Sequence, residues 1–120
     1  MINQIQVTTV FVNDQDKALE FYRNTLGMDV RIDTMMGENF RWLEVVPKGA
    51  ITSIALLSPY PGAQVGLPTG MIFDTADVQA FYDAKKDSVN FTKSPEAQPW
   101  GGISAEFTDP DGNQFGIAQK

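Results

Sequence analysis

The chain has 120 residues, a length typical of one domain, and 42% of its residues are hydrophobic. That apolar content is enough to bury a core, which excludes a disordered chain. The formal net charge of −6 disfavours binding to nucleic acid or anionic lipid, and it favours a neutral or cationic partner.

Two residue types are missing from the chain. It has no cysteine and no histidine, so it forms no disulfides, and any metal would be held by carboxylates, amides, carbonyls or water. No run of about eighteen apolar residues is present, and the N-terminus lacks a basic patch followed by a long apolar stretch. We therefore expect a cytoplasmic protein that does not interact with membranes.

The first half of the chain predicts a strand, a helix and three further strands. Residues 5–12 are β-branched and aromatic, which is typical of a strand. Residues 13–28 carry apolar side chains three and four positions apart, which predicts a helix capped by Asn13 or Asp14 and ended by Gly27. The three strands that follow are expected at residues 28–36, 40–47 and 51–58.

The second half repeats this order after a stretch rich in proline and glycine, residues 58–70, which predicts a linker. The elements expected there are a strand at 70–75, a helix at 76–89, a strand at 91–95 and two strands within 98–119. Both predicted helices contain the pair Phe-Tyr, at 21–22 and 81–82, which supports a duplicated unit. The sequence thus predicts a single domain over residues 1–120, made of one module at 1–60 and a second at 65–120.

The stretch DPDGN, residues 109–113, raises the question of a cation-binding loop, because Asp109, Asp111 and Asn113 stand at every second position. An EF-hand loop counted from Asp109 needs glycine at its sixth position and glutamate at its twelfth, where this chain has Gln114 and Lys120. Turn chemistry explains the stretch better, since proline presets φ, glycine accepts a positive φ, and the polar side chains bond to nearby amides. We therefore expect a hairpin turn between the last two strands.

The helix NDQDKALEFYRNTLGM, residues 13–28, together with DPDGNQFGI, residues 109–117, resembles the vicinal-oxygen-chelate superfamily. This superfamily contains glyoxalase I, extradiol dioxygenases, and the fosfomycin- and bleomycin-resistance proteins. The resemblance covers essentially the whole chain. It implies an α+β fold of two βαβββ modules, whose curved mixed sheets form a concave cavity for a small molecule. In short members it also implies a homodimer, with each cavity usually shared between chains.

In the metal-dependent members, the metal ligands project into the cavity from four strands. The resemblance places those positions in this chain at Val7, at Ala55 or Leu56, at Gly70 or Met71, and at Gly116. None of these side chains can coordinate the metal. The reactions that need the ion as a Lewis acid or template are then not available in their usual form. We expect no cofactor, and in this respect the chain resembles the bleomycin-binding branch.

Strand alternation predicts which side chains face the cavity. In FRWLEVV, for example, Leu43 and Val45 are expected to pack on a helix while Trp42 and Glu44 face away from it. The predicted ligand-binding residues are Thr9, Phe11, Trp42, Glu44, Asp74, Trp100 and Gln114.

Several of these residues have structural alternatives. Trp42 also suits packing or a dimer interface, and Trp100 also suits a cap on the core. Glu44 is a solvated strand charge unless its face is closed, in which case it becomes a candidate base or a partner for a cation. Asp74 is expected to cap the helix that follows it.

Three functional hypotheses follow. The first is a metal-free protein that binds and sequesters a small cationic or aromatic compound, using aromatic walls and a few carboxylates. The second is a metal-independent lyase or isomerase with Glu44 or Asp74 as general base. The third is a divergent metal-dependent glyoxalase or dioxygenase with ligands such as Glu44, Asp74 and Glu106. Whether the protein is an enzyme stays open at this point.

Overall fold

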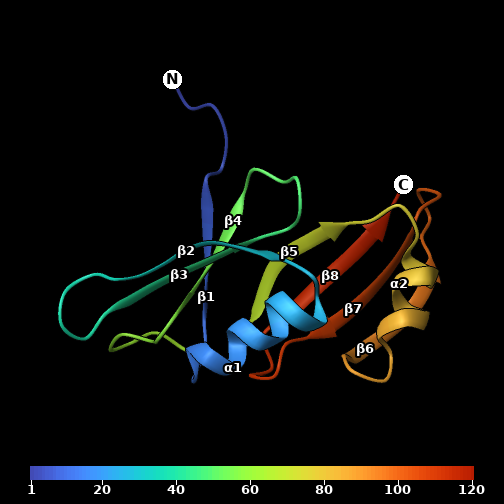
Figure 1. The fold of residues 1–120 in the computed structure, drawn as a ribbon. Coiled ribbons are helices and arrows are strands. Elements are labelled where there is room, and N and C mark those ends of the chain that lie inside the picture. The colour runs from blue at the N-terminus through green and yellow to red at the C-terminus, as the bar shows by residue number, and fades with distance from the viewer. The chain divides into compact units, whose positions relative to one another are not determined.

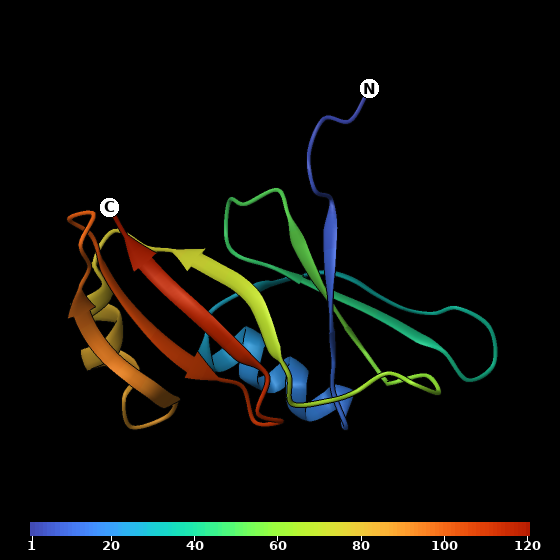
Figure 2. The same cartoon turned by 180° about the vertical axis from the view of Figure 1, so that it is seen from behind.

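The structure, a computed structural model, describes residues 1–120 and consists of two compact units, residues 1–65 and 66–120 (Figure 1). Each unit contains one helical segment and one four-stranded mixed sheet, so the fold is α+β, as predicted. Figure 2 shows the same ribbon from behind. No helix in the structure is long and apolar enough to cross a membrane.

Unit 1 follows the order strand, helix, three strands. Its elements are β1 (Val7–Phe11), α1 (Gln15–Leu19), η1 (Glu20–Thr25), β2 (Asp29–Met35), β3 (Arg41–Val46) and β4 (Ser53–Leu57). The strands lie in the order β1-β4-β3-β2, in which β1 is parallel to β4 and the other pairs are antiparallel.

Unit 2 repeats this topology. Its elements are β5 (Pro68–Asp74), α2 (Val78–Lys85), β6 (Asn90–Ala97), β7 (Ile103–Thr108) and β8 (Gln114–Gln119). The strand order β5-β8-β7-β6, with β5 parallel to β8, matches that of unit 1 position for position. The predicted βαβββ duplication is therefore confirmed.

The helix of unit 1 begins where the sequence predicts. The side chain of Asp14 accepts a hydrogen bond from the backbone of Lys17 at 3.1 Å, and Gly27 has a φ of +78°, which glycine adopts without strain. The second half of the segment is a π-helix, in which Leu26 N–H bonds to the carbonyl of Phe21, five residues back. The expected helix therefore holds only in part as an α-helix.

The core of unit 2 is aromatic. The ring of Phe107 lies within 6.0 Å, centroid to centroid, of the rings of Phe73, Phe81, Phe91 and Phe115. Phe107 and Phe115 are fully buried between the sheet and α2. Because neighbouring strands and the helix all contribute rings, these contacts hold α2 on the sheet.

The cap of α2 differs from the prediction. Asp77, and not Asp74, accepts the capping bond from Ala80 N at 3.0 Å. Asp74 is the last residue of β5, too far before the first helical residue for its side chain to reach the first-turn amides. The prediction that Asp74 caps this helix was wrong.

The stretch DPDGN forms the predicted turn. Asp109 Oδ1 accepts from the backbone of Asp111 and Asn113, both at 2.9 Å, and Gly112 has a φ of +84°. The Oδ1 of Asn113 in turn accepts from the backbone of Gly66 and Leu67, at 2.9 and 3.3 Å. This bond draws the end of the expected linker toward β8, so β5 begins at Pro68 within it.

Candidate functional site

One face of each sheet packs against the helix of its own unit, and we call the other face the helix-free face of that unit. In unit 1, Leu43 and Val45 are fully buried, while Trp42 and Glu44 are hydrogen-bonded to each other on the opposite face of β3, as alternation predicts. The register places Thr9 opposite Ala55, and Ala55 opposite Glu44. Thr9 and Glu44 therefore share this face across β4.

The ring of Phe11 has a different environment from the other predicted residues of unit 1. It packs edge-to-face on Tyr60, with ring centroids 5.1 Å apart. Thr9, two residues earlier on the same strand, is exposed. The structure thus leaves the hydroxyl of Thr9 accessible, while the ring of Phe11 already has an aromatic partner.

Glu44 is buried, with 7% of its surface exposed. Its Oε2 accepts a hydrogen bond from Trp42 Nε1 at 2.6 Å, and its Oε1 accepts one from Ser53 Oγ at 2.5 Å. No ion pair reaches this carboxylate. Glu44 is therefore neither a solvated strand charge nor half of a salt bridge, and its oxygens are held by two neutral donors.

A network of ion pairs lies at the start of β3. Arg41 donates to Asp33 at 2.8 Å and to Asp16 at 2.6 Å, which raises the pKa of the guanidinium. The hydrogen bond from Arg41 lowers the pKa of Asp33. These contacts join β2 and β3 to the start of α1. The charges of Arg41, Asp33 and Asp16 are therefore paired within the fold and are not part of a ligand site.

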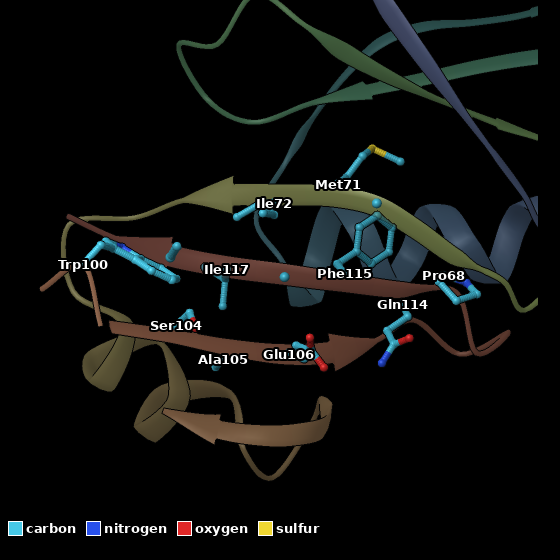
Figure 3. A pocket seen from close by; sticks show the side chains of 13 residues that line it. Pro68, Met71, Ile72, Trp100, Ser104, Ala105, Glu106, Gln114, Phe115 and Ile117 are labelled. Atoms are coloured by element: carbon cyan, nitrogen blue, oxygen red, sulfur yellow. The ribbon is translucent and has the colours of Figure 1, made fainter. Parts of the chain in front are cut away.

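The helix-free face of unit 2 contains a cavity of about 330 Å³ over β5, β7 and β8 (Figure 3). Trp100 and Gln114, both predicted ligand-binding residues, line it, and Figure 3 shows them near its two ends with Glu106 between. Its floor includes Gly116, and Ile72 presents an apolar side chain that is 72% exposed. The walls are thus mainly apolar with a few polar groups, as small-molecule sites are.

Asp74 does not line this cavity. It borders a separate depression of about 360 Å³ together with Thr75, Ala76, Gln119 and Lys120. The structure therefore brings Trp100 and Gln114 together and leaves Asp74 apart from them.

Trp100 lies in the turn before β7, and 69% of its surface is exposed. The turn is closed by bonds from Gln98 N to Gly102 O and from Gly101 N to Gln98 O, at 2.8 and 2.9 Å. A side chain on Gly102 would place its Cβ 2.7 Å from Trp100 Nε1 and 2.5 Å from Gln119 O. The indole thus rests against a backbone that only glycine leaves accessible.

A second cavity, of about 300 Å³, lies over β6 and β7. It shares Trp100, Ser104, Ala105 and Glu106 with the first cavity, and its other walls are polar: Lys93, Ser94, Glu96 and Gln98. From the sequence, Glu106 was expected only as a metal ligand. Alternation along 103–108 could have found it, because it puts Ser104 and Glu106 on one face.

The structure also tests the fit of a metal of the kind the resemblance implies. The positions concerned are Val7, Ala55, Leu56, Gly70, Met71 and Gly116, whose side chains offer no nitrogen or oxygen ligand. Acidic side chains do not gather in any group of three or more that could hold a metal ion, and Glu44, Asp74 and Glu106 do not form one. The residues present do not fit such a metal.

Comparison with known proteins gives concordant results in sequence and structure. The sequence model of the Glyoxalase/Bleomycin resistance protein/Dioxygenase superfamily matches residues 3–117. An uncharacterised Bacillus subtilis protein, YetH, is 36% identical over 120 residues, covering 96% of this chain and 97% of its own length.

Two solved structures are similar over nearly their whole length. A member of the same superfamily from Sphaerobacter thermophilus is 41% identical with a TM-score of 0.95, covering 99% of this chain and 98% of the other. TnmS3, an antibiotic-binding protein from Streptomyces sp. CB03234, is 40% identical with a TM-score of 0.89, covering 98% of this chain and 96% of the other.

Proposed function

Because the chain belongs to the glyoxalase/bleomycin resistance protein/dioxygenase superfamily, we propose that it binds a small aromatic or cationic molecule without a metal and acts by sequestering it. The observation that carries this proposal is the cavity of about 330 Å³, which the exposed indole of Trp100 lines at one end (Figure 3). An exposed tryptophan beside an apolar cavity offers a flat ring or a cation a large contact area at little entropic cost.

The antibiotic-binding relative supports the same proposal. TnmS3 is 40% identical over nearly the whole chain with a TM-score of 0.89, so an antibiotic-binding protein has nearly the same fold. The net charge of −6 further favours cationic over anionic ligands through the field at the surface. By the same family relationship we propose that the protein forms a homodimer, and light scattering on the purified chain measures this directly. We also propose that it is cytoplasmic, from its composition.

Tryptophan fluorescence tests the proposal, since Trp42 and Trp100 are the only two indoles. A panel of planar aromatic and cationic compounds is titrated into the wild-type protein and into the variants Trp100→Phe and Trp42→Phe. We expect a saturable change that Trp100→Phe abolishes and Trp42→Phe retains. No response to any compound of the panel would refute the proposal.

A blocking variant gives an independent readout. A side chain at Gly116 would stand on the cavity floor, where a Cβ comes 3.3 Å from Cγ1 of the exposed Ile72. Since the exposed side chain of Ile72 can move aside, Gly116→Val is expected to keep the fold while narrowing the cavity at its floor. Unchanged thermal unfolding together with loss of ligand response is the expected outcome, and retained binding would contradict the location of the site.

The alternative activity, a metal-independent lyase or isomerase, has a different signature. It requires turnover that survives a chelator and disappears in Glu44→Gln. Both oxygens of Glu44 already accept hydrogen bonds, and Asp74 lies outside the cavity of about 330 Å³, so the geometry favours binding over proton abstraction.

A further inference from the structure

The two units carry a glutamate at the same place in the sheet. In unit 1 the register joins Thr9, Ala55, Glu44 and Ile32 in one line across the four strands. In unit 2 the corresponding line joins Ile72, Gly116, Glu106 and Lys93. Thr9 and Ile72, which begin the two lines, each stand five residues before the aspartate that caps the helix of the unit, Asp14 or Asp77. Because the strand order is also identical, Glu106 is the structural counterpart of Glu44.

The two glutamates differ in what their oxygens receive. Glu44 accepts an indole N–H and a hydroxyl, both at hydrogen-bond distance, and is buried. Glu106 has only Lys93 nearby, with 3.8 Å between Nζ and Oε2, and 38% of its side chain is exposed. A contact of that length and exposure contributes little, so the carboxylate of Glu106 keeps the capacity to accept N–H donors from a ligand.

Glu106 also stands at the boundary between the two cavities. It lines the apolar cavity over β5 and β8 and the polar cavity over β6 and β7, and Trp100 does the same. The polar cavity contains the carboxylates of Glu96 and Glu106 against the single ammonium of Lys93. A positive group at this boundary would meet an aromatic face and an excess of negative charge.

We propose that the ligand is amphipathic, with a flat apolar body over β5 and β8 and one protonated amine at the boundary, bound by Glu106 and the ring of Trp100. This inference rests on the proposed small-molecule binding and adds the class of ligand and its orientation. In unit 1 the protein's own Trp42 and Ser53 supply the donors to Glu44, and in unit 2 the ammonium of the ligand takes their place.

A matched series of naphthylmethylamine, naphthylmethanol and naphthoate tests the inference, because the three probes share one ring system and differ in charge. Binding is followed in wild-type protein by the NMR shift of the Trp100 indole N–H, with that of Trp42 as internal reference. We expect the amine to bind about tenfold more tightly than the alcohol, from the combined carboxylate and cation–π contacts, and the acid most weakly.

Two substitutions with opposite expected effects separate recognition from general stability. Glu106→Gln should weaken amine binding about threefold to tenfold and leave the alcohol unchanged. Lys93→Gln should strengthen amine binding by up to about threefold, because it frees Glu106. Asp87→Asn removes the same charge at an exposed position of unit 2 outside these cavities, and should change neither.

The outcomes distinguish this inference from the proposed function. Equal binding of amine and alcohol, or an amine affinity insensitive to Glu106→Gln, overturns the inference while leaving small-molecule binding in place. If none of the probes shifts the Trp100 signal, both are refuted. Preference for the amine with the two opposite responses at 106 and 93 supports both.

Discussion

Replacing Glu44 by alanine tests whether one buried carboxylate holds the helix-free face of unit 1. The change removes the acceptor of two hydrogen bonds, from Trp42 at 2.6 Å and from Ser53 at 2.5 Å. Hydrogen bonds to a charged group contribute about 1.5–3 kcal/mol each, so the gross loss is about 3–6 kcal/mol. Relief of the cost of burying a charge offsets part of it. We expect the free energy of unfolding to fall by about 2–3 kcal/mol.

Glutamine at the same position should behave differently. Its carbonyl oxygen can accept from Trp42 Nε1, and its amide can donate to Ser53 Oγ, since a hydroxyl both donates and accepts. The hydroxyl proton then has the carbonyl of Gln6 as an acceptor, which is already 3.5 Å from Ser53 Oγ. Glu44→Gln therefore keeps the contacts and removes a buried charge, and its cost should stay below about 1 kcal/mol.

Urea unfolding followed by circular dichroism measures these differences, and Glu106→Ala is the matched control. It removes the same side chain from the equivalent register position, where its partner Lys93 is 3.8 Å away and mostly exposed. Its effect should lie within about 0.5 kcal/mol. The view under test is that the hydrogen bonds from Trp42 and Ser53 stabilise the fold through the buried side chain of Glu44. It would be refuted if Glu44→Ala lowered the free energy of unfolding by less than about 1 kcal/mol, or if Glu44→Gln lowered it as much as Glu44→Ala.

Three further predictions follow from the structure. Asp109→Ala should lower the free energy of unfolding by about 2–4 kcal/mol in urea titrations, because the buried carboxylate satisfies two backbone amides of the last turn; a loss below about 1 kcal/mol would contradict this. The pKa of Asp33 is lowered by the hydrogen bond from Arg41, so this pair stabilises the fold above the ordinary aspartate pKa and loses its effect as pH falls through the lowered value. Arg41→Gln should therefore cost at most about 1 kcal/mol at neutral pH and progressively less as the pH falls below the ordinary aspartate pKa, and a difference that grows on acidification would overturn the assignment. Gly102→Ala should move the indole of Trp100, because the new Cβ would lie 2.7 Å from its Nε1, and an unchanged fluorescence maximum in a Trp42→Phe background would count against that contact.

The strands were predictable from the sequence because alternation is a local property. The run FRWLEVV assigned Leu43 and Val45 to the core and Trp42 and Glu44 to the other face without knowledge of any partner strand, and the structure agrees. The turn at DPDGN was likewise predictable, since its backbone bonds join residues at most four positions apart.

The features that the sequence did not reveal depend on residues far apart in the chain. The early start of β5 results from Asn113, which binds the backbone of Gly66 47 residues away. The buried state of Glu44 depends on Ser53, nine residues further on, across the pairing of β3 with β4. The π-helical half of the first helical segment was not predicted for another reason. Over one or two turns, the spacing of apolar side chains fits an α-helix and a π-helix equally well.

The two units show how one topology leads to different surfaces. The positions that face the helices are apolar in both, because that packing determines the fold, and the helix-free positions are under no such constraint. In unit 1, Ala55 and Thr9 flank a glutamate whose oxygens the protein itself satisfies. In unit 2, glycine and an exposed isoleucine flank a glutamate that has only one distant partner. The same side chain should therefore serve folding at one site and ligand recognition at the other, so that removing Glu44 lowers stability and removing Glu106 lowers affinity.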